Sequence, residues 1–517
     1  GGSNPIIGQR SDIVDRNGRI LATNLDTYSL YAQPPQMIDP KLAVTKLVEI
    51  FPELDRDRLM RDFTGDRKFV WVRRQISPEQ MQAVFDIGDP GLLFGPREMR
   101  LYPNGSLAGH ILGGARYGRE GVDSAEVIGV AGVERQFDDY LRDPANEGAP
   151  LQLSIDLTVQ AAIEEVLAGG MSMMNAKGAS AVLMDVRTGE IIAMASLPDF
   201  DPNNRPGAPT SGDPSDSPLF NRAIQGVYEL GSVFKIFTMS AALDLNIVTP
   251  ETVVDTSGPL TIGRFRIRDF RNYGDALTAS EIIVKSSNIG TGRIALQIGA
   301  ERLRSYFAAL GLLEVTSVEL PEAAVGRPLF PDRWSDIGVV TMSYGQGIAT
   351  SPVQLAAGYA AVANGGTRVY PTLLRRDTAA PGPRAFRADV SRQAVDMLRQ
   401  VVVKGTATFG EVPGYQVAGK TGTADKPSPS GGYYADKVIS TFASVFPASD
   451  PQYVLVLTLD EPSENSTDKP RRTAGWTAVP VAAEAIRRVG PLLGLRPIVE
   501  DQLTTAAFVP AEPLPDR

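Results

Sequence analysis

The sequence predicts an α+β protein whose main sheet is split along the chain and is preceded by a smaller mixed domain. Two groups of apolar strand candidates, within 180–197 and 415–460, flank a long stretch that is mostly helical in pattern to about residue 404. A polar break at 143–150 ends the mixed first segment. We therefore predict domains at 1–148 and 149–496, with a loosely ordered tail at 497–517.

The first segment combines a hairpin with helices. Apolar residues alternate on both sides of Asn17-Gly18, a dipeptide that favours the tight turn of a β-hairpin. Residues 41–51 and 77–87 carry apolar positions at helical spacing. The segment offers no clustered nucleophile, metal ligands or phosphate loop, and we expect a non-catalytic domain.

The second segment has a helix, a hairpin, a long loop and a second group of strands. Residues 187–189 form the turn of the hairpin, and the loop at 199–217 is rich in Pro, Gly, Asp and Ser. The expected helices are 157–174 and 476–489, and the expected strands are 180–186, 190–197, 415–423, 439–446 and 453–460.

Composition excludes several classes of function. The net charge of −9 and the lack of a basic run argue against a general nucleic-acid surface. The absence of cysteine excludes a thiolate nucleophile, and the single histidine, His110, excludes a histidine-rich zinc site. No apolar run approaches the ~18 residues of a membrane span. The opening Gly1-Gly2-Ser3 resembles an expression scar, so a native amino-terminal anchor would not be visible.

Ser232 and Lys235 stand out because a lysine lies inside an apolar stretch, YELGSVFKIFT. Residues three apart on a helix share a face, so the two side chains can meet. Serine becomes a useful nucleophile only when a base takes its proton. Burial and a helix amino terminus both lower the pKa of a lysine, which would make Lys235 such a base. Ser466 and Lys469 match the same spacing in a polar loop, so this pattern alone is weak.

Two further motifs strengthen the assignment. Ser286 and Asn288 form Ser-x-Asn after an amphipathic run, although Ser463 and Asn465 match that pattern as well. The strand-like run YQVAGKTGTA contains Lys420, Thr421, Gly422 and Thr423, which can bind a carboxylate and leave strand backbone open to a substrate. The ordinary structural interpretations are a helix cap for Ser286 and an edge strand for Lys420. All three motifs in this order are far from chance.

The chain resembles the penicillin-binding proteins, serine D,D-transpeptidases whose motifs are this trio. It is most similar to the monofunctional class B group and its division-type, FtsI-like branch, with RSDIVDRNGRILA, IGVAGVERQFDDYL and MSYGQGIATSPVQLAAGY as further matching stretches. Ser11 and Leu230 depart from the family's usual glycine and proline. The resemblance implies an antiparallel sheet with helices on both faces and a helical insertion, preceded by an elongated pedestal or dimerisation domain. His110 falls in that first domain and is expected to be structural.

The resemblance also implies a mechanism for cross-linking peptidoglycan. Ser232 would attack the penultimate D-alanine of a stem peptide while Lys235 takes its proton, and an amine would then resolve the acyl-enzyme. Ser286 would relay a proton, Asn288 would bind the substrate amide, and Lys420 would help to lower the pKa of Lys235. Thr421 and Thr423, beside Gly422, would bind the terminal carboxylate, with the Ser232 and Thr423 N–H groups as the oxyanion hole. β-Lactams would acylate Ser232.

We expect no cofactor and no metal; Asp199-x-Asp201-x-Asn203 begins like a calcium loop but has Thr210 where a glutamate is needed. The implied partners are stem peptides, β-lactams and an FtsW-type membrane glycosyltransferase with other division proteins, with no nucleic acid. The implied location is periplasmic, anchored to the inner membrane. The loops 199–217 and 425–436 are expected to border the cleft and to order on substrate binding.

Several functions remain open from the sequence. An elongation-type transpeptidase is the nearest alternative, and a β-lactamase or a β-lactam sensor would share the three motifs. A D,D-carboxypeptidase, an inert scaffold and a bifunctional glycosyltransferase fit less well. Rapid turnover of a β-lactam would favour the β-lactamase, and acylation without cross-linking would favour the sensor.

Overall fold

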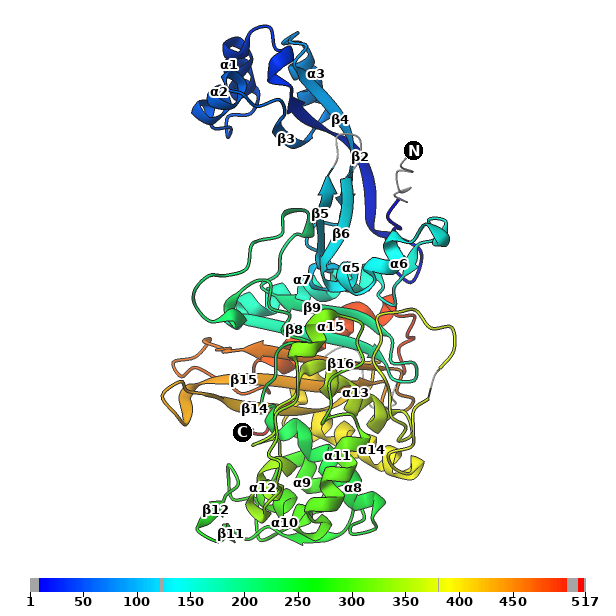
Figure 1. Ribbon diagram of the computed structural model, residues 1–517. Coiled ribbons are helices and arrows are strands. Elements are labelled where there is room, and N and C mark those ends of the chain that lie inside the picture. The colour runs from blue at the N-terminus through cyan, green and yellow to red at the C-terminus, as the bar shows by residue number, and fades with distance from the viewer. Residues whose placement is uncertain (1–8, 121–124, 380, 500–509, 516–517) are drawn as a thin grey trace. The chain divides into compact units, whose positions relative to one another are not determined.

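The computed structural model describes residues 9–120, 125–379, 381–499 and 510–515 (Figure 1). The described chain divides into two compact units. The first contains the residues up to Val14 with 20–105 and 112–151, and the second contains 15–19, 106–111 and the residues from Gln152 onward. Each unit is described separately.

The first unit is built on the long strand β2 (Ile20–Ala32), which pairs with the neighbouring strands in antiparallel fashion. The predicted hairpin is confirmed, because β1 and β2 pair through Val14 and Ile20, and Gly18 has a φ of 82°. The predicted helices at 41–51 and 77–87 are also confirmed, and Asp39 and Ser77 cap their first turns. The other elements of this unit are β1 (Ile13–Val14), β3 (Val70–Ile76), β4 (Leu92–Leu101), β5 (Gly114–Glu120), β6 (Ala125–Ala131), α1 (Pro40–Ile50), α2 (Arg56–Thr64), α3 (Pro78–Phe85), α5 (Gly132–Gln136) and α6 (Asp138–Arg142).

A buried ionic cluster joins three segments of the first unit. Glu134 is fully buried and accepts hydrogen bonds from Arg10 (3.1 Å), Arg100 (2.8 Å) and the Tyr102 hydroxyl (2.6 Å). Burial alone would raise the pKa of Glu134, but Arg100 and Arg10 hold it below its ordinary value. The carboxylate therefore stays charged and ties residues 10, 100–102 and 134 together.

The second unit contains a five-stranded antiparallel sheet with the order β14-β15-β16-β8-β9. The strands are β8 (Gly178–Asp185), β9 (Ile191–Leu197), β14 (Ala418–Pro427), β15 (Tyr433–Phe446) and β16 (Tyr453–Asp460), so all five predicted strands are confirmed. Pairing of β16 with β8 joins the two groups that lie far apart in sequence. β14 is an edge strand of this sheet, which leaves one side of its backbone unpaired by strands.

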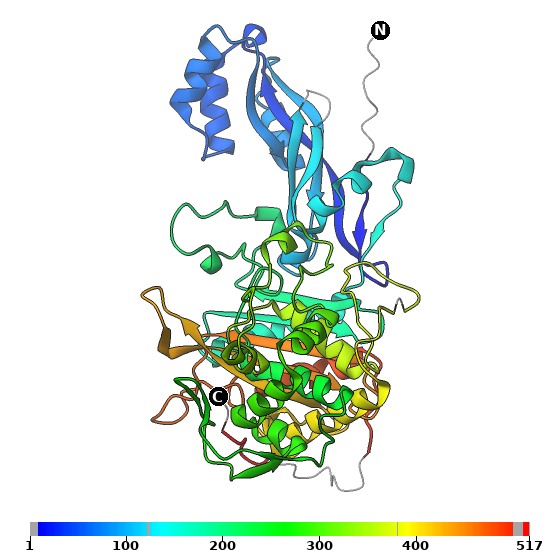
Figure 2. The same cartoon turned by 60° about the horizontal axis from the view of Figure 1, so that its bottom comes forward.

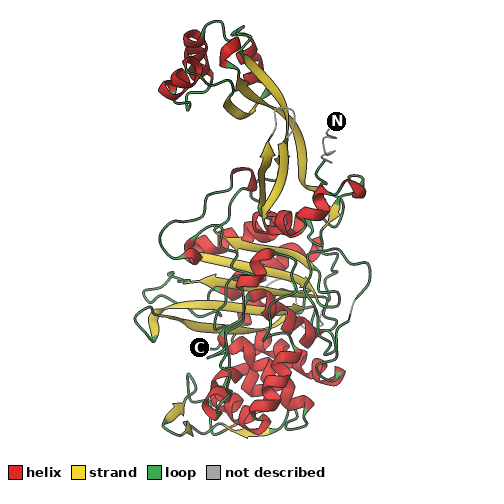
Figure 3. Cartoon of the chain, in the orientation of Figure 1, coloured by secondary structure: helices red, strands yellow, loops and turns green. Residues whose placement is uncertain are grey.

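Helices cover the sheet, which forms the yellow layer between red helices in Figure 3. The predicted helices 157–174 and 476–489 are confirmed as α7 and α15, which pack on each other. α13 (Pro352–Ala363) is buried along its whole length, and Figure 2 shows the helical insertion in front of the sheet. The helices of this unit are α7 (Leu157–Met173), α8 (Lys235–Asp244), α9 (Ala279–Lys285), α10 (Asn288–Ile298), α11 (Ala300–Ala309), α12 (Asp336–Ser343), α13, α14 (Ala388–Lys404) and α15 (Ala478–Leu492); α4 (Gly109–Leu112) and β7 (Leu151–Gln152) lie at the division between units.

The insertion is less helical than the sequence predicts. Four three-residue strands lie within 253–278: β10 (Val253–Asp255), β11 (Leu260–Ile262), β12 (Phe265–Ile267) and β13 (Ala276–Thr278). They form two separate two-stranded pairs. Strands this short contain too few residues for an alternating pattern to be recognised in the sequence.

A short segment, 106–111, groups with the second unit although we expected its His110 in the first domain. The Glu164 carboxylate accepts the Ala108 N–H at 2.9 Å, and His110 packs edge-on against the Phe200 ring. Burial lowers the pKa of His110 to about 4, so the ring is neutral and structural. Burial also raises the pKa of Glu164 to about 7, and the neighbouring Asp199 carboxyl contributes to that rise.

Part of the tail packs against the second unit. Leu514 donates its N–H to the Gly405 carbonyl at 3.0 Å, and Pro513 is buried near Gly475. Residues 500–509 and 516–517 of the tail and the opening residues 1–3 lie outside the described residues.

Candidate active site

The nucleophile candidate lies on a tight turn at the start of a buried helix. Residues Gly231–Phe234 form a 3₁₀ turn and α8 begins at Lys235, so the single α-helix predicted over this stretch is replaced by two helical types. Gly231 has a φ of 73°, a conformation that a residue with a side chain rarely adopts. In a 3₁₀ turn residues three apart eclipse each other, which places Ser232 and Lys235 on the same side.

Buried backbone contacts hold this turn in position. Gly231 donates its N–H to the Gly345 carbonyl, and the Tyr359 hydroxyl donates to the Val233 carbonyl at 2.6 Å. A Cβ on Gly345 would lie 2.0 Å from the Gly231 carbonyl oxygen. Gly345 therefore permits a backbone approach that any other residue would prevent.

Three candidate residues from three separate motifs meet at one hydroxyl group. Lys235 Nζ lies 2.8 Å from both the Ser286 carbonyl oxygen and Ser286 Oγ. Lys420 Nζ lies 3.0 Å from the same Oγ. Both lysines are fully buried, and Ser232 and Ser286 are about as inaccessible at 4% and 5%. The structure therefore brings together the Ser-x-x-Lys, Ser-x-Asn and Lys-Thr-Gly motifs.

The Ser-x-Asn motif forms a strained junction between two helices. Ser286 ends α9 with a φ of 64°, a left-handed conformation that is costly for a residue with a Cβ. Ser287 caps α10 and donates its hydroxyl to Asp269 Oδ2 at 2.7 Å, and Asp269 Oδ1 accepts the Ile289 N–H. Asn288 Oδ1 is buried and makes no hydrogen bond within the described part of the chain. This oxygen therefore has hydrogen-bonding capacity that the described contacts do not use.

The Lys-Thr-Gly motif lies on the edge strand β14, beside the nucleophile turn. A Cβ on Gly422 would lie 2.4 Å from the Leu230 carbonyl oxygen, so glycine allows the strand and the turn to touch. The Thr421 hydroxyl is buried and hydrogen-bonded to the Thr406 hydroxyl at 2.7 Å. Thr423 is half-buried, and its Oγ1 accepts the Ala474 N–H at 2.8 Å. The Thr423 hydroxyl proton is therefore still available to a ligand.

A cavity of about 510 Å³ is lined in part by residues close in sequence to the Ser-x-x-Lys and Lys-Thr-Gly motifs. Its walls come from 227–229, 329–331, 347–349 and 425–427, together with Ile439. Glu229 is fixed in this wall because its carboxylate accepts the Gly347 N–H at 2.8 Å and the Tyr433 hydroxyl at 2.9 Å. Burial and the Glu229 charge raise the pKa of Tyr433 to about 12, so it stays protonated as a donor.

The loops predicted to border the cleft differ in structure. Much of 425–436 belongs to the hairpin of β14 and β15, and residues 425–427 line the cavity. The loop 199–217 contains the 3₁₀ turns Pro202–Asn204 and Pro214–Asp216. Ordering of either segment on substrate binding remains a prediction.

The competing sequence matches are not part of this site. Ser466 and Lys469 are exposed, and Ser463 and Asn465 bond to each other in an irregular turn. In the calcium-like stretch, Asp201 accepts the Asn203 N–H as a 3₁₀ cap. No group of three or more His, Cys, Asp or Glu side chains suited to a metal occurs within the described ranges. No helix among the described residues is long and apolar enough to span a membrane.

Sequence reasoning missed three residues that build the site. Asp269 aligns the Ser-x-Asn junction from a loop 18 residues before Ser287, and no local pattern marks it. Glu229 and Gly345 lie in stretches that carry the family resemblance, but only the folded contacts give them a positioning role.

The fold and the three converging motifs define a transpeptidase of the penicillin-binding type. Residues 179–484 match the family model described as the penicillin-binding protein transpeptidase domain, and residues 5–147 match the penicillin-binding protein dimerisation domain. The chain therefore belongs to the class B penicillin-binding proteins of the FtsI type.

Curated relatives and solved structures agree with this assignment. The chain is 37% identical to the probable peptidoglycan D,D-transpeptidase FtsI of Caulobacter vibrioides over 98% of this chain and 85% of the relative. It is 30% identical to peptidoglycan D,D-transpeptidase FtsI of Escherichia coli K12, over 96% and 85%. The crystal structure of penicillin-binding protein 3 from Mycobacterium tuberculosis complexed with aztreonam superposes with a TM-score of 0.73 at 26% identity, over 95% of this chain and 98% of the other.

Proposed function

We propose that this chain is a peptidoglycan D,D-transpeptidase that cross-links stem peptides through an acyl-enzyme on Ser232. The observation that carries the proposal is the meeting of Lys235 and Lys420 at Ser286 Oγ, beside the turn that presents Ser232. Relatives named as peptidoglycan D,D-transpeptidases support the reaction class.

Lys235 acts as the base for Ser232 in this mechanism. Two fully buried ammonium groups that share one neutral oxygen repel each other, and burial penalises each charge. Loss of one proton relieves the repulsion. We assign the neutral form to Lys235, because it is the lysine in the same helical turn as Ser232 and can then accept its proton. Lys235 then takes the Ser232 proton as Oγ bonds to the carbonyl carbon of the penultimate D-alanine.

The first half-reaction ends with an acyl-enzyme. The amide C–N bond breaks, and the leaving D-alanine nitrogen receives a proton through the Ser286 hydroxyl from Lys235. The Ser232 and Thr423 N–H groups hold the tetrahedral oxyanion, an arrangement worth about 3 kcal/mol per donor in other enzymes. An acceptor amine then attacks the ester and loses its proton to Lys235 through the same relay. As the new amide forms, the C–Oγ bond breaks and Lys235 returns a proton to Ser232 Oγ.

Substrate binding uses groups that still have hydrogen-bonding capacity. Asn288 accepts a backbone N–H of the stem peptide at its Oδ1. Lys420 supplies positive charge near the terminal carboxylate, and the Thr423 hydroxyl donates to it while Thr421 supports the strand through Thr406. Gly422 keeps the strand close to the nucleophile turn.

Labelling with a fluorescent penicillin tests the nucleophile. Intact-mass spectrometry should show one stable adduct per chain, which Ser232→Ala abolishes. Ser466→Ala is the matched control, since it alters the exposed second match to Ser-x-x-Lys and should label normally. Rapid release of hydrolysed drug would favour a β-lactamase, and labelling of Ser232→Ala would refute the assignment.

Cross-linking needs a separate measurement because a sensor would also be acylated. Purified protein incubated with a stem-peptide donor and an amine acceptor should release D-alanine and form the cross-linked product. Acylation by penicillin without any product would favour the sensor. Release of D-alanine with water as the only acceptor would favour a carboxypeptidase.

The cellular role proposed here is septal wall synthesis on the periplasmic side of the inner membrane. FtsI relatives support division, and an FtsW-type glycosyltransferase is the expected partner because cross-linking consumes newly made strands. Co-purification of the full-length protein with that glycosyltransferase from membranes tests the partnership. Association with an elongation-type glycosyltransferase in its place would favour the elongation alternative.

A further inference from the structure

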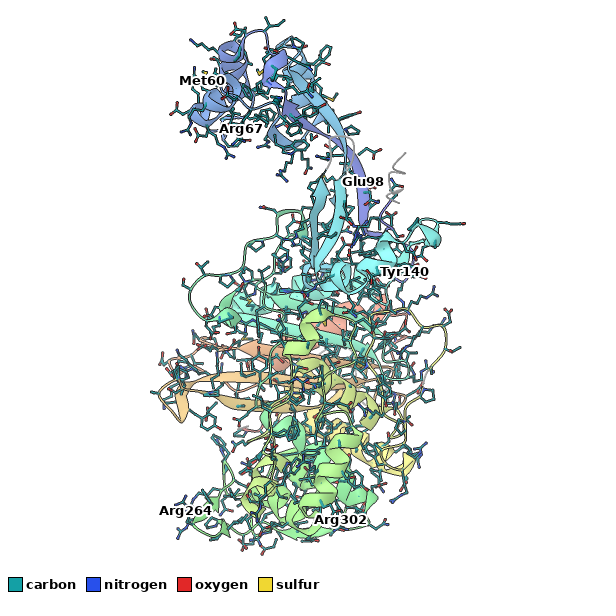
Figure 4. All side chains as sticks on the ribbon, viewed as in Figure 1. Met60, Arg67, Glu98, Tyr140, Arg264 and Arg302 are labelled. Atoms are coloured by element: carbon teal, nitrogen blue, oxygen red, sulfur yellow. The ribbon has the colours of Figure 1, made fainter. Side chains whose placement is uncertain are left out.

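A short hairpin in the helical insertion concentrates positive charge in an acidic protein. We name residues 260–273 the arginine hairpin: β11 and β12, joined by a two-residue turn, and the loop that follows. It carries Arg264, Arg266, Arg268 and Arg271, all exposed, whereas the whole chain has a net charge of −9. Arg264 lies at the tip of this hairpin in Figure 4.

These arginines are not neutralised by the surrounding protein. Among the described residues, Arg266, Arg268 and Arg271 have no ion pair and no side-chain hydrogen bond, and Arg264 lies over the Phe265 ring at 5.3 Å. The nearby carboxylates are Asp269, which accepts hydrogen bonds from residues 287 and 289, and the exposed Asp275. The guanidinium groups are therefore available for an anionic ligand.

The hairpin packs against the helix that carries Asn288. Leu260, with Ile262 and Ile267, packs on Ile289 and Val340 in a small apolar cluster. Because side chains alternate across a strand, this packing turns the neighbouring Arg266 to the opposite face. The arginines are thus carried by a hairpin whose apolar face is packed, and an ordered backbone lowers the entropic cost of binding a ligand.

A polar cavity of about 290 Å³ opens beside these arginines. The residues that line it include Arg268, Arg271, Asn272, Ser257 and Ile289, together with the carboxylates of Asp269 and Asp275. Two guanidinium forks with an amide and a hydroxyl match the acceptor oxygens of a carboxylate.

The cavity lies beside the start of the helix that carries Asn288, because Ile289, the next residue, lines it. Asp269 lines the cavity and bonds to the residues on either side of Asn288. Asn288 Oδ1 has no hydrogen-bond partner within the described ranges. A peptide bound at Asn288 has this cavity next to it.

We propose that the arginine hairpin and its cavity bind side-chain or backbone carboxylates of a peptidoglycan stem peptide held at Asn288, through Arg268 and Arg271. This inference rests on the proposed function and adds a second anchoring point to it. The site acts on polymeric wall strands, which carry many such carboxylates, and is not needed for a small β-lactam. An acidic protein partner is less well supported, because the cavity adjoins the substrate-binding asparagine.

Binding of soluble uncross-linked peptidoglycan strands tests the site. The strands carry a fluorophore, the protein carries Ser232→Ala to prevent turnover, and anisotropy gives the affinity at low and moderate salt. Arg268→Ala/Arg271→Ala should weaken binding about 10- to 100-fold and flatten its salt dependence. Arg392→Ala/Arg496→Ala, which removes two exposed arginines elsewhere, is the matched control and should bind normally.

Two further measurements decide between the explanations. With Ser232 restored, the hairpin variant should be acylated by penicillin at the native rate. If the protein with the native hairpin is not acylated either, the proposed function is refuted and the binding site is not. Strands whose stem-peptide carboxylates are amidated should bind native protein as weakly as the hairpin variant binds ordinary strands. Undiminished binding of the hairpin variant, or of amidated strands, would overturn the inference.

Discussion

Removing the Ser286 hydroxyl should disable acylation without unfolding the protein. Ser286 Oγ lies 2.8 Å from Lys235 Nζ and 3.0 Å from Lys420 Nζ, so Ser286→Ala removes two contacts to lysine. Hydrogen bonds to charged groups contribute about 1.5–3 kcal/mol each. If about 2–4 kcal/mol of this is lost in the transition state, acylation slows about 30- to 1000-fold. Stopped-flow labelling with a fluorescent penicillin measures the rate.

A second variant at the same position separates chemistry from backbone strain. Ser286 has a φ of 64°, and a left-handed residue with a Cβ costs about 1 kcal/mol or more. Ser286→Gly also lacks the hydroxyl but relaxes the backbone, so it should acylate as slowly as Ser286→Ala while unfolding at a higher temperature. The reasoning fails if Ser286→Ala acylates within about threefold of the native rate, or if glycine restores the rate.

Three further changes test packing and charge. Gly422→Ala places a Cβ 2.4 Å from the Leu230 carbonyl oxygen. It should lower the free energy of unfolding in urea by about 1–3 kcal/mol and slow penicillin acylation. Unchanged stability and rate would show that the strand and the turn are not in contact there. Glu134→Ala leaves the buried Arg100 without a carboxylate partner and Arg10 with Asp138 alone. It should cost about 3–5 kcal/mol in the same assay, more than the isosteric Glu134→Gln; a loss below about 1 kcal/mol would refute this. The pKa of Glu164 is raised from 4.5 to about 7, so the native protein loses stability as the pH rises from 4.5 to 7. Glu164→Gln should remove up to about 3 kcal/mol of this loss. The prediction is refuted if the free energy of unfolding of the variant depends on pH as that of the native protein does.

The catalytic domain was predictable because its signals are local and strong. The five strands of its sheet are apolar runs bounded by turns, and α7 and α15 have clear helical periodicity. The order of the motifs around Ser232, Ser286 and Lys420 identified the reaction class. The short strands within 253–278 were missed because a three-residue strand has no recognisable period and depends on its tertiary partners.

The sequence by itself determined the residue types of the site, its three motifs and the class of protein. Only the tertiary structure decided how those residues meet: β16 pairs with β8, which brings the edge strand with Lys420 to the turn that carries Ser232. The left-handed Ser286 and its alignment through Asp269 likewise depend on contacts between distant segments. The periodicity of apolar side chains indicates which face of a helix or strand is buried, but not which other helix or strand covers that face. The shared hydroxyl between two buried lysines is therefore a property of the fold.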